Sequence, residues 1–288
     1  MSAPADFRFV HRLRVRWVEV DAQQVVFNGH YLTYLDTAVS DYWRAVGLPY
    51  PDAFRFVQGD VFVRRNTIEY HAPAKLDDWL DIGVRCERVG TSSITVVWAV
   101  WAQGRLLVTG EAVYVFTSLL TGKSAAVPDS VKAQLNAHAQ GQAVHTLRSG
   151  AWADLNAASR AVRTAVFIDE QRIPESEEWD DDDAGAIHVV ASNLVGLPLA
   201  TGRLIYLGQP AGTAKIGRMA VLRCTRGVGL GQAVLQDLIA QARLRQVTHI
   251  SLHAQVSAQA FYAGQGFTAQ GDVFDEVDIP HQLMTLTL

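Results

Sequence analysis

Hydrophobic and polar residues alternate at the start of the chain. From Phe7 to Trp17, apolar side chains take one set of alternate positions and four arginines take the other, with a break at Val10 and His11. A period of two residues is that of a half-buried β-strand. We expect the arginine face of this strand to be exposed to solvent.

A helical period follows, after a loop over residues 19–29. Apolar residues recur at intervals of three and four, and the pattern ends at Gly47 and Pro49; the apolar set is Tyr31, Leu35, Ala38, Val39, Tyr42 and Val46. This spacing predicts an α-helix. Leu32 and Trp43 widen its apolar surface, so we expect the helix to be covered on more than one side.

Four extended segments come next, separated by short turns. They cover residues 61–71, 79–89, 93–102 and 106–119. Strands joined by short turns form an antiparallel meander. One strand, one long helix and this meander predict an α+β layer in which the sheet curls around the helix.

The character of the chain changes after residue 119. The sequence Gly122-Lys123-Ser124 is not a P-loop, because the first glycine of that motif is missing. A polar, helix-like run over residues 129–139 and a tract rich in Ala, Gln and His follow it. We interpret this region, to about Ser149, as a connector and predict two domains, residues 1–141 and 142–288.

Helix and strand patterns are mixed in the second half. Helical spacing covers residues 154–169, 230–246 and 257–264; extended segments cover residues 186–193, 196–207, 214–221 and 250–254, with closing strands near residues 273 and 284–288. This mixture predicts an α/β domain. Residues 215–231 stand at its centre as a strand, a glycine-rich turn and the start of a helix.

The glycine-rich turn is Arg-Gly-Val-Gly-Leu-Gly at residues 226–231. Glycines let successive N–H groups converge, and a helix N-terminus adds partial positive charge, so such a turn suits a phosphate or pyrophosphate. Gln232 departs from the dinucleotide-binding fingerprint, and no Lys-Ser or Lys-Thr ends the loop. From these residues alone, a purely structural turn is an equal alternative.

Composition excludes some classes of function. The formal net charge of −4 over 288 residues gives no overall attraction to nucleic acid or anionic lipid. Cys86 and Cys224 lack CxxC or metal-ligand spacing, which favours buried thiols in a reducing compartment and no metal site. The chain shows neither a signal-peptide pattern nor an apolar run long enough to span a bilayer, so a cytoplasmic location is expected.

Several short motifs in the first half carry a family resemblance. They lie at residues 16–22, 25–32, 70–74, 77–80 and 110–112. Together they resemble the hotdog-fold acyl-CoA thioesterases of the 4-hydroxybenzoyl-CoA type, over roughly residues 6 to 128. The resemblance implies that Asp21 is the catalytic carboxylate and that backbone N–H groups near Asn28 and Gly29, at the start of the helix, polarise the thioester carbonyl.

Two further features follow from this resemblance. Glu19 stands where relatives often have an acid and is interpreted as a supporting or surface residue, whereas Gln24 replaces a usual glycine and could reshape the acyl pocket. Hotdog domains pair through their sheets, with the sites at the interface. A homodimer or homotetramer through this domain is therefore expected.

A second resemblance is carried by residues 226–231, by Phe-Tyr-Ala-Gly-Gln-Gly-Phe at 261–267 and by shorter segments around residues 166–174, 201–204, 215–221 and 279–281. These motifs resemble the ElaA-like branch of the GNAT superfamily of N-acetyltransferases. The resemblance implies an acetyl-CoA substrate, whose pantetheine arm meets the backbone of Met219 and Val221. It also implies a pyrophosphate site formed by Arg226, Gly227, Val228, Gly229, Leu230 and Gly231.

The same resemblance makes Tyr262 the general acid that protonates the departing CoA thiolate. An amine must lose a proton before it attacks, and Glu170, Glu178, His188 or a water that they hold are the candidate bases. The acidic tract over residues 175–183 is either a solvated loop or a mouth that attracts a cationic amine by long-range charge.

Both halves are thus expected to act on CoA thioesters, one passing the acyl group to water and the other to an amine. We expect a bifunctional enzyme with small-molecule partners, no metal and no nucleic-acid or membrane partner. The alternative is an acetyltransferase whose hotdog half serves only for dimerisation or acyl-CoA sensing. A CoA-binding regulator with both sites silent is the non-enzymatic alternative.

Overall fold

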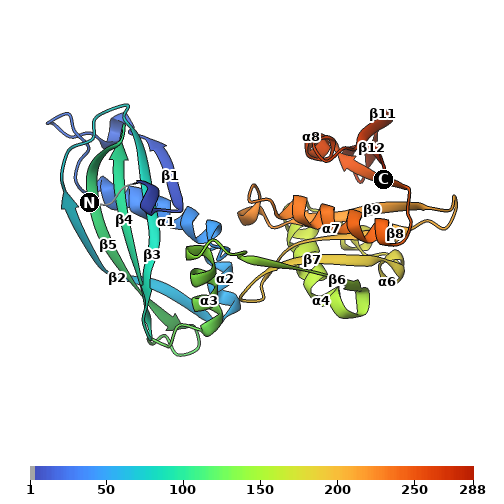
Figure 1. Cartoon of the computed structure of the whole chain (residues 1–288), viewed down its shortest axis with the longest axis horizontal. Helices are drawn as coiled ribbons and strands as arrows, with labels where there is room; N and C mark the ends of the chain where they lie inside the picture. The colour runs from blue at the N-terminus through green and yellow to red at the C-terminus, as the bar shows by residue number, and fades with distance from the viewer. Residues whose placement is uncertain (1–3) are drawn as a thin grey trace. The chain divides into compact units, whose positions relative to one another are not determined.

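A computed structural model describes residues 4–288 of the protein, and the chain divides into two compact units between Val144 and His145 (Figure 1). Each unit contains one sheet.

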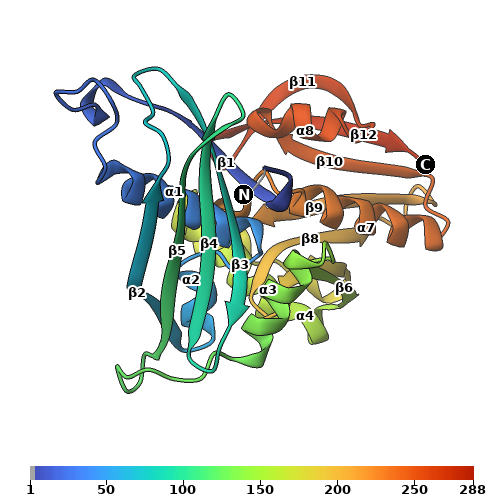
Figure 2. The ribbon, with the colours of Figure 1, turned by 60° about the vertical axis from the view of Figure 1, so that its left-hand side comes forward.

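The first unit is one long helix, α1 (His30–Ala45), and a five-stranded antiparallel sheet in the order β1-β3-β4-β5-β2 (Figure 2). The strands are β1 (Phe9–Arg14), β2 (Gly59–Tyr70), β3 (Trp79–Val89), β4 (Ser93–Ala102) and β5 (Arg105–Ser118). Short helices complete it: η1 (Pro4–Asp6), η2 (Trp17–Glu19), α2 (Asp52–Phe56) and α3 (Asp129–Ala139). The predicted α+β layer is confirmed.

Aromatic side chains dominate the buried face of α1. This face carries Tyr31, Tyr34, Leu35, Ala38, Val39, Tyr42 and Trp43. The tyrosine hydroxyls have partners within the core: Tyr31 accepts from the N–H of Ala74 at 3.1 Å, and Tyr42 accepts from the N–H of Cys86 at 2.9 Å. Because a buried hydroxyl without a partner is costly, these bonds fix the helix against the sheet as well as filling the core.

The region predicted as a connector is ordered structure, which corrects that interpretation. Helix α3 buries Val131 and Leu135, and the side-chain amide of Gln134 donates to the carbonyl oxygens of Val46 and Val144, each at 2.6 Å. The tract from His145 onward then forms a strand, β6 (His145–Ala151). The strand lies at a sheet edge with most residues exposed, so it lacks the hydrophobic alternation that would have revealed it.

The second unit is a seven-stranded sheet in the order β11-β12-β10-β9-β8-β7-β6. Its other strands are β7 (Ile187–Asn193), β8 (Pro198–Tyr206), β9 (Thr213–Val221), β10 (His249–Gln255), β11 (Thr268–Glu276) and β12 (Ile279–Thr287). Helix α4 (Trp152–Arg163) continues as the π-helix η3 (Thr164–Glu170). The other helices are α5 (Glu175–Glu178), α6 (Asp182–Gly185), η4 (Arg223–Thr225), α7 (Leu230–Leu244), η5 (Val256–Ala258) and α8 (Gln259–Ala263). The predicted mixed α/β domain is confirmed.

Helices α4 and α7 cover opposite faces of this sheet. Successive residues of β7 show this: the ring of His188 packs on Trp152 of α4, whereas Val189 belongs to the apolar core around α7. That core also contains Val234, Leu235, Leu238, Ile239 and Ala242 of α7 itself. The predicted apolar spacing of the helix at residues 230–246 is therefore the spacing of its buried face.

Strands β9 and β10 diverge at the middle of the sheet. They pair in parallel only where His249–Ser251 lie beside Thr213–Lys215, although β9 continues to Val221 and β10 to Gln255. The backbone of Arg218 is left-handed, with φ +50°, and the register with β8 shifts at the same place. This irregularity is a β-bulge, which bends a strand and interrupts its ladder. Beyond Lys215, the edge of β9 that faces β10 therefore has no strand partner within the described residues.

Candidate functional site

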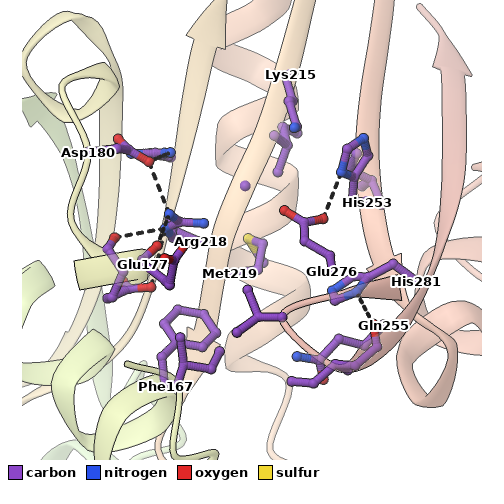
Figure 3. Close-up of a pocket in the computed structure, with 18 of the residues that line it drawn as sticks. Phe167, Glu177, Asp180, Lys215, Arg218, Met219, His253, Gln255, Glu276 and His281 are labelled. Carbon is purple, nitrogen blue, oxygen red and sulfur yellow. Dashed lines mark hydrogen bonds and ion pairs between the residues drawn. The ribbon is translucent and has the colours of Figure 1, made fainter. Parts of the chain in front are cut away.

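A cavity of about 390 Å³ lies beside the point where β9 and β10 diverge. It is lined by the end of η3, the acidic tract, β8, β9, β10, α8 and the β11–β12 hairpin. Figure 3 shows Arg218 with Glu177 and Asp180 along one wall, Met219 between the walls, and His253, Glu276 and His281 along the other. The cavity thus joins an unpaired backbone edge to two walls of titratable side chains.

Met219 and Tyr262, both predicted from the sequence, line this cavity. Tyr262 lies on α8 within the apolar core, with its ring edge-on to Phe261 and Phe267. Burial raises the pKa of Tyr262 to about 12, so the phenol keeps its proton at neutral pH. Val221, at the end of β9, is not among the lining residues.

The glycine-rich turn presents free backbone donors. Gly227 and Gly229 have φ values of +86° and +88°, a left-handed conformation that favours glycine, and Gly229 is the N-cap of α7. Within the part of the chain that the structure describes, no acceptor meets the backbone N–H groups of residues 227–231. Unsatisfied N–H groups at a helix N-terminus are suited to binding an anion.

The side chain of Arg226 does not point free into this turn. Its guanidinium makes two 2.7 Å hydrogen bonds to the carboxylate of Glu170, and its Nε donates to the carbonyl of Val221 at 3.1 Å. The hydrogen bond from Arg226 lowers the pKa of Glu170. Glu170, a candidate base from the sequence, is therefore an ionised partner of the turn and does not line the cavity.

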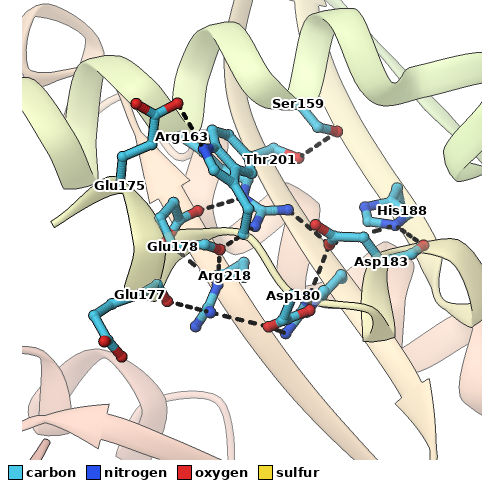
Figure 4. A network of polar contacts seen from close by, with 12 residues as sticks. Ser159, Arg163, Glu175, Glu177, Glu178, Asp180, Asp183, His188, Thr201 and Arg218 are labelled. Carbon is cyan, nitrogen blue, oxygen red and sulfur yellow. Dashed lines mark hydrogen bonds and ion pairs between the residues drawn. The ribbon is translucent and has the colours of Figure 1, made fainter. Parts of the chain in front are cut away.

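Three carboxylates of the acidic tract, those of Glu178, Asp180 and Asp183, form a network of ion pairs with three arginines (Figure 4), whereas Glu175, Glu177, Asp181 and Asp182 are exposed as predicted for a solvated loop. Arg163 is buried and pairs with Glu178 and, at 2.7 Å, with Asp183. Arg203 bonds Asp183 at 2.7 Å, and Asp180 bridges Arg203 and Arg218. These arginines come from α4, β8 and β9, far from the tract in sequence, so local composition could not reveal them.

Tryptophans close the network on one side. The guanidinium of Arg163 lies 4.6 Å from the ring centre of Trp179 and 5.6 Å from that of Trp152. Aromatic faces attract a cation most strongly where water is excluded. The tract is therefore fixed over the sheet and forms a rigid wall of the cavity.

The three candidate bases thus lie in different surroundings. Glu178 lines the cavity but is almost wholly buried; burial raises its pKa, against the effect of Arg163, with which it pairs. His188 lies outside the cavity lining, with only 1% of its surface exposed, and its Nε2 is 2.9 Å from the carbonyl oxygen of Asp183. The structure does not bring Glu170, Glu178 and His188 together.

Sequence reasoning missed the other wall of the cavity. His253 of β10, Glu276 of β11 and His281 of β12 lie there, and Nδ1 of His253 is 2.9 Å from Oε2 of Glu276. The alternation of residues in β10 could have located His253. Ile250, Leu252 and Ala254 are buried against α7, which places the residues between them on the opposite face of the sheet.

The first unit has a separate cavity, of about 630 Å³, lined by Trp17, Val18, Val20, Asp21, Gln24, Lys75 and Leu76. Asp21 lies in the loop before α1, and its Oδ1 accepts from the N–H of Gln23 at 2.8 Å, as in an Asx-turn. Asn28 and Gly29 start α1 but do not line this cavity. Their own N–H groups meet no acceptor among residues 4–288, so they are available to a ligand.

Glu19 is the anchor of the loop that carries Asp21. Only 2% of its surface is exposed, and its carboxylate accepts from the N–H of Arg16 at 2.7 Å, from Nε of Arg16 at 2.8 Å and from the hydroxyl of Tyr34 at 2.7 Å. Burial opposes ionisation, but these hydrogen bonds outweigh it and lower the pKa of Glu19. Its role is support, and it is not a surface residue.

The position of Gln24 has a backbone explanation. Its φ is +61°, in the left-handed region where a side chain is disfavoured. The usual glycine of this motif would adopt this conformation without strain. Gln24 also lines the cavity beside Asp21, so its side chain occupies space next to the candidate carboxylate.

Comparison with known proteins defines the class of each half. Residues 23–109 match the family model of the Thioesterase superfamily, and residues 170–288 match that of the Acetyltransferase (GNAT) domain. The chain belongs to both families, one in each half, and both family resemblances predicted from the sequence are confirmed.

Each of three relatives matches less than half of this chain. YyaT of Bacillus subtilis (strain 168) is 34% identical over 136 residues, which are 46% of this chain and 88% of YyaT. The uncharacterized N-acetyltransferase YjcF of the same organism is 30% identical over 124 residues, 43% of this chain and 86% of YjcF. The acyl-CoA thioester hydrolase YbgC of Escherichia coli O6:H1 is 31% identical over 123 residues, 42% of this chain and 91% of YbgC.

No helix in residues 4–288 is long and apolar enough to cross a membrane. No group of three or more His, Cys, Asp or Glu side chains in that range is arranged to hold a metal ion.

Proposed function

We propose that the protein is a bifunctional enzyme of CoA thioesters, a thioester hydrolase in its first unit and an acetyl-CoA-dependent N-acetyltransferase in its second. The observation that carries the proposal is the unpaired edge of β9, which runs from the cavity toward a turn of free N–H groups. An extended ligand can bind along the strand edge, and its phosphates can bind at the helix N-terminus.

In the second unit, the pantetheine arm of acetyl-CoA lies along β9 and bonds the backbone of Met219 and Val221. The pyrophosphate lies on residues 226–231, where Gly227 and Gly229 keep side chains away from the turn and α7 contributes its positive end. The acetyl group then lies in the cavity, near Tyr262.

Tyr262 acts as the general acid in this proposal. When the amine nitrogen attacks the thioester carbon, the C–S bond breaks and the sulfur needs a proton. A phenol with a pKa of about 12 is protonated at neutral pH and so has a proton to give. Its position in the cavity wall supports this role.

In the first unit, Asp21 attacks the thioester carbonyl or activates a water molecule. The N–H groups of Asn28 and Gly29, at the start of α1, stabilise the negative charge that develops on the carbonyl oxygen; one such donor contributes about 10²–10³ in rate. The free state of these N–H groups supports the assignment.

A second copy of the chain completes this site in our proposal, as a homodimer or homotetramer. Strand β2 is one of the two edge strands of the first sheet, it is 12 residues long, and 57% of Phe62 and 49% of Val63 are exposed. A long edge strand with exposed apolar side chains invites pairing with another strand. A partner there would cover residues that a lone unit leaves in water.

One observation favours the alternative in which only the second unit is catalytic. Asp21 lines its cavity without Asn28 or Gly29, so the carboxylate and the carbonyl donors do not share one cavity within a single copy. The first unit would then pair the copies or sense acyl-CoA, and it would hydrolyse nothing.

Thiol release from a panel of acyl-CoA thioesters, with and without amines, tests both units. We expect Asp21→Asn to abolish amine-independent release and Tyr262→Phe to reduce only amine-dependent release. No hydrolysis by the wild type would favour the alternative, and hydrolysis retained by Asp21→Asn would refute the proposed role of Asp21. No amine-dependent release by the wild type would refute the acetyltransferase assignment.

A further inference from the structure

The wall of the cavity formed by β10, β11 and β12 contains a histidine–carboxylate pair, His253 and Glu276 (Figure 3). Tyr262 and Met219 line the same cavity, so the pair shares its space with the proposed acid and with the proposed path of the acyl group. Both members are partly open, with 33% and 43% of their side chains exposed, and a ligand in the cavity could reach them.

The hydrogen bond within the pair sets the state of the imidazole. Burial opposes ionisation of Glu276, but the hydrogen bond to His253 and the charges of His253, His281 and Lys215 together outweigh this effect and lower the pKa of the carboxyl. An ionised carboxylate only accepts hydrogen bonds, so Nδ1 of His253, 2.9 Å from Oε2, carries the proton. In the neutral ring the lone pair is then on Nε2, which is free to accept a proton.

Other groups around the pair hold it in place. Phe274 packs edge-on to His253, with ring centres 4.9 Å apart, and stacks on His281 on its other side. His281 and Lys215 are the neighbouring groups whose charge acts on Glu276. On the opposite wall, Glu178 and Asp180 are already bonded to arginines. His253 is therefore a side chain of the cavity that is arranged to accept a proton.

We propose that His253 is the catalytic base of the second unit, removing a proton from the ammonium group of the acceptor, and that Glu276 is the positioning residue that fixes its ring. This inference rests on the acetyltransferase function proposed above. It replaces the candidates Glu170, Glu178 and His188, of which the first two are bonded to arginines and the third lies outside the cavity.

The proton balance of the reaction is complete with these groups. Nε2 of His253 takes one proton from the ammonium, and the free amine attacks the thioester carbon. The C–S bond then breaks, the sulfur takes the proton of Tyr262, and the nitrogen returns its surplus proton to the phenolate as the amide forms. The proton on His253 passes to water.

The charge of the cavity favours a protonated amine as the class of acceptor. The lining contains five carboxylates, Glu177, Glu178, Asp180, Asp182 and Glu276, against three basic side chains, Lys215, Arg203 and Arg218. A cavity with a surplus of negative charge attracts cations and favours the ammonium form, so an acceptor bound there needs a base.

The test compares acceptors that need a base with one that does not. Alkylamines (ethylamine, putrescine and lysine) are ammonium ions at neutral pH, whereas hydroxylamine is largely unprotonated. We expect His253→Gln to lower kcat/KM for the alkylamine used best by about 10²-fold or more, with a much smaller loss for hydroxylamine. Glu276→Gln should give a smaller loss of the same kind. His249→Gln, at the other end of β10, should leave kcat/KM unchanged for both kinds of amine.

Calorimetric titration with CoA, run on each variant, shows whether the fold is intact. Three outcomes would overturn the assignment of the base while leaving acetyl transfer in place. They are an equal loss for both kinds of amine in a variant that binds CoA normally, no loss in His253→Gln, and transfer by the wild type to hydroxylamine alone. Transfer by the wild type to none of these amines would overturn the proposed acetyltransferase itself.

Discussion

At the scale of single residues, Glu19 shows how a buried charge supports a loop. Its carboxylate receives donors from Arg16 and Tyr34, while its carbonyl oxygen accepts from the N–H of Phe27 at 2.9 Å. One residue therefore bonds the start and the end of the loop that carries Asp21. Losing such a bond to a charged group costs about 1.5–3 kcal/mol.

Replacing Glu19 by Gln should therefore destabilise the protein most at neutral pH. The pKa of Glu19 is lowered in the folded state, so its contribution is complete above the ordinary glutamate pKa and is lost as the pH falls through the lowered value. Thermal unfolding at pH 7 and near pH 3 measures the difference. Glu87→Gln, an exposed control, should change little, and an equal effect of Glu19→Gln at both pH values would contradict this account.

Gln24 permits a second prediction at this scale. The left-handed backbone of Gln24 costs about 1–2 kcal/mol. Glycine would avoid this cost, but its greater conformational entropy in the unfolded chain would offset part of the gain. We expect Gln24→Gly to leave the melting temperature unchanged or higher, and Gln23→Gly, whose φ is not positive, to lower it. A lower melting temperature for Gln24→Gly alone would show that the side chain makes a stabilising contact.

At the scale of elements, the pair of Arg226 and Glu170 links the glycine-rich turn to the end of η3. Without a ligand, the carboxylate of Glu170 is hydrogen-bonded to the guanidinium of Arg226 and places a negative charge next to the proposed pyrophosphate site. Binding of CoA would have to overcome both effects.

Removing that carboxylate should strengthen CoA binding. Because a partly exposed ion pair contributes about 0.2–1 kcal/mol, we expect Glu170→Gln to lower the Kd for CoA by up to about fivefold. The gain should shrink as salt screens the charges. Calorimetric titration at two salt concentrations measures it, with Asp169→Asn as the neighbouring control; weaker binding by Glu170→Gln would show that Glu170 itself assists the ligand.

The elements with strong periodicity were predictable from the sequence. The pattern of α1 follows directly from its apolar spacing, because one face of the helix is buried. The strands β3 and β4 follow from apolar segments between short turns, and β4 is buried on both faces. Strand β6 and the fixed acidic tract were not predictable, since exposed edges carry no pattern and the arginines that bind the tract lie on distant elements. Motifs located the turn and Tyr262, but the pairing of His253 with Glu276 depends on how β10, β11 and β12 are arranged in the sheet.

At the scale of the whole molecule, the free edge of β2 predicts association. Phe62→Lys together with Val63→Lys should convert the homodimer or homotetramer to smaller species, because charges placed on an edge strand oppose pairing. Val10→Lys is the matched control, on β1 at the other edge of the sheet. Sedimentation velocity distinguishes these outcomes, and a wild type that sediments as a monomer would refute the predicted association.

The two hydrogen bonds donated by the side-chain amide of Gln134 have a practical consequence for expressing the two halves of the protein separately. A recombinant first half that stops at residue 141 would omit Val144, whose carbonyl oxygen is one acceptor for the Gln134 amide, whereas a half that stops at residue 144 keeps both acceptors. Loss of a hydrogen bond at a buried amide costs about 1–3 kcal/mol. The longer fragment should therefore express in soluble form at temperatures where the shorter one precipitates.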